Sequence, residues 1–165
     1  MALPNKVLPG FSASMYAQPS ANPTVLTTAQ VSSLSSVAAI AIPANLMNIE
    51  AVPAFGQDDA VASFTVAGSR QSDKIPSQSA PTSMTITAAW NPGDAVINTL
   101  IRGDAYNGTV DRTYVIAATD GTNIVYYTFV GRASQFQIDS APGAEAKCVF
   151  TIHPRGNYYG WCNNA

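Results

Sequence analysis

Residues 114–134 read YVIAATDGTNIVYYTFVGRAS, and this stretch predicts a β-hairpin. The runs on either side of its centre are rich in β-branched and aromatic residues, which favour strands. Between them, Asp120 and Gly121 supply the positive φ angles that a two-residue type I′ turn requires. We therefore expect two strands, over residues 114–119 and 122–130, that pair with each other.

Alternating apolar residues predict further strands on both sides of this hairpin. An alternation with a period of two is typical of a strand with one buried face. In residues 82–90, the apolar face holds Met84, Ile86, Ala88 and Trp90. Two later strands, over residues 134–138 and 146–152, place on their apolar faces Phe136 and Ile138, and then Ala146, Cys148, Phe150 and Ile152.

A short helix is predicted between the strand that ends at Trp90 and the hairpin. Residues 91–93, Asn-Pro-Gly, break the strand, and Asp94 is suited to cap a helix. Arg102 and Gly103 are expected to end it. The apolar positions of this helix share one face, as expected for a helix that packs on a sheet, and they are Val96, Ile97, Leu100 and Ile101.

The remaining segments are expected to extend from a single domain that spans residues 1–165, because a chain of this length suits one core. Prolines interrupt the N-terminal part. Residues 56–81 are rich in Ser, Gln and Asp. Loops longer than about 15 residues are uncommon unless they are functional, so this stretch is interpreted as a long projecting hairpin loop. The expected segments are an N-terminal arm over 1–33, two short strands over 36–42 and 46–52 or one interrupted strand, the long loop over 56–81 with a strand-like run at 62–66, and a C-terminal arm over 155–165.

The composition favours a protein whose surface becomes an interface between subunits. Charged residues make up 11% of the chain, against roughly 25% in an average soluble domain. Small polar residues take their place, and such a surface costs little to desolvate. An ordinary β domain of low charge is the alternative. The net charge is −2 with no basic run, which argues against tight binding of phosphates.

Targeting and cysteine signals are weak. The first 11 residues, MALPNKVLPGF, lack the apolar core of a signal peptide, and Pro43 stops the longest apolar stretch, so neither export nor a membrane span is expected. Cys148 and Cys162 are expected to be reduced thiols of a cytosolic protein.

No motif in the sequence supports an enzyme. The single histidine, His153, has no glutamate or cysteine at metal-ligand spacing. The sequence contains no G-x-S-x-G, GxGxxG, phosphate loop or CxxC, although a triad built from distant residues stays open. We therefore expect no catalytic residue, no metal and no cofactor. The aromatic residues Tyr158, Tyr159 and Trp161 keep a sugar-binding platform as an alternative.

The order of these elements, together with a few matching residues, resembles lambda-type siphophage major tail proteins. The similarity lies in TITAAWNPGD at 85–94, the helix to Gly103, the hairpin of 114–134 and the strand that ends in IHPRG at 152–156. It covers about residues 82–156. The resemblance implies a mainly β tail tube fold, a small β-sandwich or half-barrel with one short flanking α-helix.

The resemblance also implies a function and partners. Subunits of that family form hexameric rings that stack into a tube, through which genomic DNA leaves the head. The chain would then be a homo-oligomer in the virion tail, assembled in the host cytoplasm. Its partners would be tail terminator, tail tip and tape-measure proteins. DNA would pass through the lumen without sequence-specific binding, and no membrane is involved.

Three groups of residues are predicted to serve such a tube. Gln135, Gln137 and Asp139 form a polar strand face that would line the lumen, or is an ordinary solvated face. The expected contacts between rings come from the long loop, and those of the C-terminal arm from its aromatic residues. The ring contacts are Asp58, Asp59, Phe64, Arg70 and Lys74, and the arm contacts are Tyr158, Tyr159 and Trp161.

Other assembly proteins remain alternatives at this stage. A tail terminator or a capsid decoration protein can share the β-sandwich fold. A terminator is expected to form rings without filaments. A carbohydrate-binding module, the least favoured reading, is expected to stay monomeric and to lose sugar affinity when Tyr158, Tyr159 or Trp161 is replaced.

Overall fold

The computed structural model describes residues 12–21, 45–65, 67–68, 72–119, 124–140 and 142–163. Strands dominate this part of the chain. The elements are β1 (Ser12–Ala17), β2 (Asn45–Leu46), β3 (Gln57–Thr65), β4 (Ser72–Pro81), β5 (Met84–Ala89), η2 (Val96–Ile101), α2 (Arg102–Asn107), β6 (Arg112–Thr119), β7 (Ile124–Asp139) and β8 (Lys147–Asn163).

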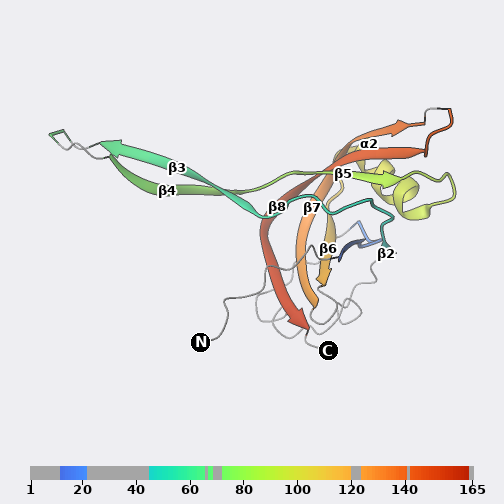
Figure 1. Ribbon diagram of the computed structural model, residues 1–165, viewed down its shortest axis with the longest axis horizontal. Coiled ribbons are helices and arrows are strands. Elements are labelled where there is room, and N and C mark those ends of the chain that lie inside the picture. The colour runs from blue at the N-terminus through green and yellow to red at the C-terminus, as the bar shows by residue number, and fades with distance from the viewer. Residues whose placement is uncertain are drawn as a thin grey trace.

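The body of the protein is a six-stranded sheet in the order β2-β1-β6-β7-β8-β5. All its neighbouring strands pair antiparallel. The long strands β7 and β8 bend along their length, so that the sheet curls into a half-barrel (Figure 1). The expectation of a mainly β half-barrel with one short helical segment is therefore confirmed.

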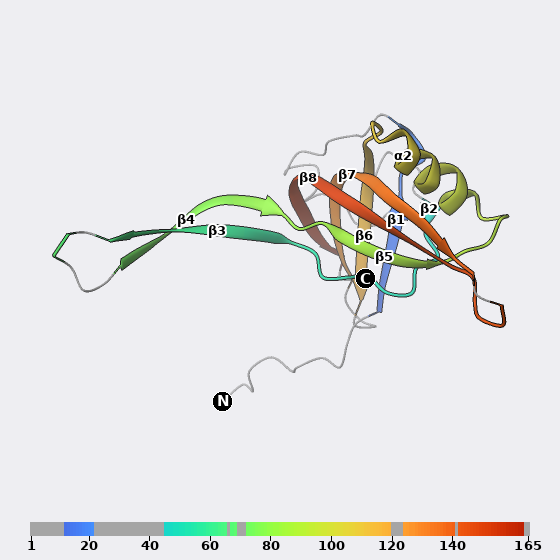
Figure 2. The same cartoon turned by 90° about the horizontal axis from the view of Figure 1, so that it is seen from above.

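One face of the curled sheet holds the core. Side chains directly opposite each other on paired strands point to the same face, and the pairs Met15 with Ile116 and Ile86 with Phe150 are fully buried. The helical segment covers this face (Figure 2) and contributes Ile97 and Ile101 to the same cluster. The other core residues include Ala17, Met47, Met84, Ala88, Tyr114, Phe129, Ala133, Cys148 and Ile152.

β3 and β4 form a separate two-stranded hairpin. It projects from the body as a long arm that the rest of the described chain does not cover (Figures 1 and 2). Residues 56–81 were expected to be a loop with one strand-like run. They project as expected, but most of the segment is paired β-structure, because its Ser, Gln and Asp side chains still allow a ladder when both faces meet solvent.

The predicted strand around residues 82–90 is confirmed as β5, with Met84, Ile86 and Ala88 buried. The hairpin of β6 and β7 is confirmed too, but its register differs from the prediction. Thr119 pairs with Ile124, so four residues, not two, separate the last paired positions. The turn itself lies outside the described residues.

Two strands predicted as separate, 122–130 and 134–138, are one strand, β7. A β-bulge lies between Ser134 and Gln137, where the register against β8 shifts. Gln135 has a φ of 56° there, the only non-glycine residue with positive φ among those described. The bulge shifts the alternation along β7, so that Ala133 before it and Phe136 after it both pack in the core.

The helix begins as predicted and ends later. Asp94 Oδ1 accepts hydrogen bonds from the backbone N–H groups of Val96 and Ile97, at 2.9 and 3.2 Å. The segment starts as a π-helical turn and continues as α2 past Gly103. It ends at Gly108, whose φ of 63° suits a glycine C-cap. Gly103 is tolerated inside because packing on the sheet stabilises the helix.

Both predicted arms contain sheet strands. Residues 12–17 form β1, which lies between β2 and β6 with Met15 and Ala17 fully buried. Residues 155–163 continue β8 along β7. In each case a partner strand from a distant part of the sequence supplies the pairing. Of the two short strands predicted early in the chain, 36–42 lies outside the described residues and only Asn45–Leu46 is a strand near the second.

No helix in the described residues is long and apolar enough to cross a membrane. Cys148 is a free, buried thiol. Burial raises its pKa to about 11. Cys162 lies in the same strand, fourteen positions along, and pairs with Val125 while Cys148 pairs with Ile138. A disulfide between them within one chain is excluded, because its Cα atoms must lie within about 7 Å.

Candidate assembly surfaces

The β3–β4 hairpin exposes apolar side chains on both of its faces. Phe64 is 63% exposed and Val61 is 58% exposed. The register pairs Phe64 with Asp73 and Val61 with Pro76. Since side chains alternate along a strand, Phe64 and Val61 point to opposite faces. An isolated two-stranded hairpin is at best marginally stable in water, so this exposed arm is a candidate contact surface.

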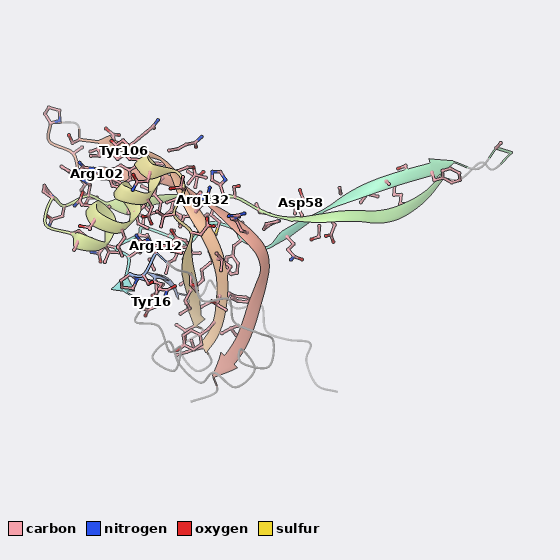
Figure 3. The ribbon with its side chains drawn as sticks, turned by 180° about the vertical axis from the view of Figure 1, so that it is seen from behind. Tyr16, Asp58, Arg102, Tyr106, Arg112 and Arg132 are labelled. Carbon is pink, nitrogen blue, oxygen red and sulfur yellow. The ribbon has the colours of Figure 1, made fainter. Side chains whose placement is uncertain are left out.

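Charge is distributed unevenly along the hairpin. Asp58 and Asp59 lie near its base and are exposed, and Figure 3 shows Asp58 where the hairpin leaves the body. Lys74 is exposed further out, opposite Ser63. The hairpin is therefore acidic at its base, and further out it carries one residue of each sign, because Lys74 follows Asp73, the strand partner of Phe64. Arg70, the fifth predicted contact residue, lies outside the described residues.

A groove lies beside the base of the hairpin. It has a volume of about 530 Å³. One wall is anchored to the body because Phe55 packs edge-on against Tyr127, with ring centroids 5.1 Å apart. Its side chains are apolar except for that of Glu50, while backbone groups add polar surface, and the lining comprises Ala13, Glu50, Ala51, Val52, Pro53, Ala54 and Phe55.

Acidic side chains gather near the rim of this groove. Glu50 forms an ion pair with Lys147, and Glu145 lies 3.9 Å from the same ammonium group. These contacts raise the pKa of Lys147, chiefly through the hydrogen bond to Glu50. Asp139 is the strand partner of Lys147. One cation thus faces several carboxylates, and the rim carries a net negative charge.

The two edges of the sheet are partly covered. At one edge, β2 pairs with only Tyr16 and Ala17 of β1. At the other, the outer side of β5 is bridged by Ile49 at Ala88, with Glu50 N–H donating to Thr87 O at 2.9 Å. Within the described chain, no strand pairs with the outer side of Met84 to Ile86. Open edges of this kind invite pairing between chains.

The predicted polar face is present at one end of the sheet. Gln137 and Asp139 are exposed, and they pair with Val149 and Lys147 on the face opposite the core. Gln135 sits in the bulge, where its Oε1 accepts a hydrogen bond of 3.2 Å from Thr151 Oγ1. Ile138, predicted to be apolar and inward, is 44% exposed at the end of the strand.

His153 joins three segments on this same face. Its Nδ1 lies 2.8 Å from Ser83 Oγ and its Nε2 lies 2.7 Å from Ser134 Oγ. Both ring nitrogens are therefore used in hydrogen bonds that tie β8 to its neighbours. No group of histidine, cysteine and carboxylate side chains that could hold a metal occurs in the part of the chain that the structure describes.

Two charged clusters fix the end of the sheet near the helix. Arg112 is buried against Asp104 of α2 and also donates to the carbonyl of Gln18 at 3.4 Å. Asp111 accepts from Arg132 Nε at 2.8 Å and from Arg155 Nη1 at 2.5 Å. Figure 3 shows Arg112 and Arg132 between the helix and the curled strands. Sequence patterns missed these pairs because the charges are scattered along the chain.

The arginines set the protonation of Asp111. Burial by itself raises the pKa of this carboxyl, but the hydrogen bonds and charges of Arg132 and Arg155 outweigh burial and hold its pKa below the ordinary 3.8. In the other cluster, the hydrogen bond to Asp104 raises the pKa of Arg112. The charged forms of Asp111 and Arg112 are therefore favoured, and the two clusters hold the helix and the neighbouring strands together.

The predicted C-terminal contact residues lie in β8. The backbone of Tyr159 pairs with Thr128, and that of Trp161 pairs with Tyr126. Tyr158 immediately precedes Tyr159 in the same strand. Their side-chain positions lie outside what the structure describes, and their backbone belongs to the sheet of the same chain.

Comparison with known proteins gives matches in structure only. No family model and no curated protein matches the sequence. The fold is similar to a chain of the anti-feeding prophage baseplate, with a TM-score of 0.63, 10% identity and 97% of both chains covered. It is also similar to a chain of the sheath/tube terminator of an extracellular contractile injection system, with a TM-score of 0.62, 13% identity, and 96% and 97% covered.

A further match is the SPP1 tail tube, with a TM-score of 0.53, 11% identity, and coverage of 93% of this chain and 77% of that chain. The tube-terminating cap of the anti-feeding prophage matches with a TM-score of 0.60, 13% identity, and 100% and 95% covered. These matches define the architecture as the tail tube fold. At such low identity the comparisons establish the fold alone.

Proposed function

We propose that this chain is a structural subunit of a bacteriophage tail tube, in which hexameric rings stack around a lumen that conducts genomic DNA. One observation carries the proposal: the β3–β4 hairpin projects from the body with Phe64 and Val61 exposed on opposite faces. A monomer gains nothing from such an arm. Burial of these side chains against other copies would supply the driving force for assembly.

The sheet edges support ring formation. Within the described residues no strand pairs with the outer side of β5 from Met84 to Ile86, and β2 at the other edge is two residues long. Pairing the edges of neighbouring subunits would continue the curled sheet around a ring and remove the exposed edges. Contacts between unlike surfaces that do not close produce a filament.

The polar face supports a conduit. In this proposal Gln135, Gln137 and Asp139 face the lumen, and none of the three is cationic. Neutral amides and a carboxylate do not hold phosphates, so DNA would slide past without sequence-specific contacts. The protein would act without catalysis, in the virion tail after assembly in the host cytoplasm, with tail terminator, tail tip and tape-measure proteins as partners.

A tail terminator is the second candidate. The similarity to terminator and cap chains in two solved assemblies, with TM-scores of 0.62 and 0.60, favours it. The two functions differ in their assembly products, because a terminator caps a tube and does not itself extend.

Negative-stain electron microscopy of the purified chain over a concentration series tests both functions. A tube subunit gives hollow filaments with a regular axial repeat. Isolated rings at every concentration favour the terminator. A strictly monomeric protein at high concentration contradicts both and favours the binding-module alternative.

A further inference from the structure

We propose that Asp111 keeps the polar face of the sheet from retaining DNA, because it holds Arg132 and Arg155 of that face in ion pairs. The polar face is the side of β5, β7 and β8 opposite the core, and the pairing is called masking below. The inference rests on the proposed function and deepens it, since it names a residue that lets a conduit carry cations without binding its cargo. The ligand that Asp111 excludes is the phosphate backbone of a nucleic acid.

The two arginines lie on the same face as the residues proposed to line the lumen. Side chains two positions apart along a strand share a face, and so do side chains opposite each other on paired strands. On β8 this face runs from Lys147 to His153, which pair with Asp139 and Arg132 of β7. The extra residue of the β-bulge lies in β7, so the alternation along β8 is unbroken between them. Arg155 follows His153 by two positions and reaches the same carboxylate as Arg132.

Asp111 uses both of its carboxylate oxygens to hold the arginines. Oδ1 accepts a hydrogen bond from Arg132 Nε at 2.8 Å, and Oδ2 accepts one from Arg155 Nη1 at 2.5 Å. The carbonyl of Gly108 accepts a further hydrogen bond of 3.0 Å from Arg132 Nη1. The side chain of Asp111 is 20% exposed, whereas that of Arg155 is 60% exposed. A phosphate that approaches this face can therefore reach the guanidinium groups more readily than the carboxylate.

Unpaired arginines at these positions would bind DNA. A guanidinium presents a planar fork of donors that fits a phosphate, and each phosphate that a protein neutralises adds affinity that falls with salt. Asp111 takes a donor from each of the two guanidinium groups and cancels half of their combined charge. Its replacement by a neutral residue would leave two positive charges and their donors open to the DNA backbone.

The remaining cation of the polar face is held in the same way. Lys147 forms an ion pair with Glu50, and Glu145 lies 3.9 Å from the same ammonium group. Every cation that the structure describes on this face thus has a carboxylate partner, although the two ends of the face draw their carboxylates from different segments. Away from this face, Arg102 of α2 forms no ion pair within the described residues and lies over the ring of Tyr106. Masking is therefore a feature of the polar face.

Three variants test the masking. Asp111→Asn removes the charge of the carboxylate with little change of shape. The matched control is Glu145→Gln, which removes the same charge from a side chain that is 86% exposed. A triple variant combines Asp111→Asn with Arg132→Gln and Arg155→Gln, and so removes the cations that the first change would release. Far-ultraviolet circular dichroism confirms that each variant folds.

Fluorescence anisotropy of a short labelled DNA duplex measures the affinity over a salt series, with the full chain kept below the concentration at which assemblies form. We expect Asp111→Asn to bind at least about tenfold more tightly than the wild type at low salt. The slope of log affinity against log salt should be steeper by about two, since two more phosphates are neutralised. Glu145→Gln should stay within about twofold of the wild type because Glu50 still holds Lys147. The triple variant should bind like the wild type.

Arg155→Gln in the otherwise unchanged chain is a separate check. A masked arginine contributes nothing to DNA binding, so this variant should keep the wild-type affinity within about twofold. A clear loss of affinity would show that Arg155 binds DNA in spite of Asp111, and would overturn the masking.

The masking and the tube function fail in different ways. An Asp111→Asn chain that binds DNA no more tightly than the wild type overturns the masking, and so does a triple variant that keeps the tighter binding. Wild-type filaments in micrographs leave the tube function standing in both cases. Tighter binding by Asp111→Asn, in a protein whose wild type forms neither filaments nor rings, supports the masking and overturns the tube function.

Discussion

Arg112 on β6 donates hydrogen bonds from Nε and Nη2 to the two carboxylate oxygens of Asp104 on α2, and both side chains are buried, at 6% and 3% exposure. The pair joins the helix to the sheet. Arg112 also donates to the carbonyl of Pro19, just after β1. A single guanidinium therefore ties three segments that lie far apart in the sequence.

Removal of one member of this pair should be strongly destabilising. Asp104→Ala leaves a buried guanidinium without its carboxylate, and we expect the free energy of unfolding to fall by about 3–5 kcal/mol. Urea denaturation followed by circular dichroism measures it. Arg155→Ala is the control: it breaks an exposed pair with Asp111 and should cost about 1 kcal/mol or less. Equal losses of the free energy of unfolding in the two variants would contradict a special role of the buried Arg112–Asp104 pair.

Asp111 should make stability depend on pH in the acid range. Its pKa is held below 3.8 in the fold, so its pairing stabilises the protein fully above the unfolded value and is lost as pH falls through the folded value. Asp111→Asn should therefore be less stable than the wild type at pH 6, by about 1 kcal/mol or less. The difference in urea midpoint should shrink below about pH 4, near the unfolded value of an aspartate. A difference that stays constant with pH would exclude this role.

The stability of the fold should depend on whether the residue at position 135 can adopt the positive φ angle of the bulge. A φ of 56° is costly for a β-branched side chain and free of strain for glycine. We expect Gln135→Val to lower the free energy of unfolding by about 1–3 kcal/mol, while Gln135→Gly stays within about 1 kcal/mol despite losing the bond to Thr151. Thermal unfolding of the two variants compares them. A valine variant as stable as the glycine variant would show that the bulge is not under strain.

Shortening the hairpin should separate folding from assembly. Asp59 and Ser79 lie opposite each other, so residues 60–78 can be replaced by an Asn-Gly turn without moving the body. We expect a folded subunit with the wild-type circular dichroism spectrum that forms no filaments in electron micrographs. Filaments from this variant would show that the hairpin is not the stacking contact.

Local sequence patterns predicted correctly those elements whose structure depends on residues close by in the chain. The alternation around Ile86, the strand character of 114–119 and the cap at Asp94 all appear in the fold. Each depends on neighbours within a few residues, through a period of two, a turn signal or a side chain that accepts from the next N–H groups. The helix end failed because Gly103 is tolerated in a helix that packs on the sheet.

Part of the candidate site could also be anticipated. The projecting segment and its residues Asp58, Asp59, Phe64 and Lys74 were identified from a polar stretch too long for an ordinary loop. The groove could not be anticipated from the sequence, because Ala13 and residues 50–55 come together only when β1 lies in the sheet. Nothing in the sequence near Ala13 marks it as a wall of a groove.

The sequence by itself determined a mainly β chain of low charge, with one capped helix, a central hairpin and a projecting segment, since composition and short periods record these directly. Only the tertiary structure decided which strands are neighbours: it buried β1, extended β8 along β7 and left β3 and β4 without cover. The reason is physical. Strand pairing and burial depend on partners many residues away, and a local pattern records a buried face without recording what buries it.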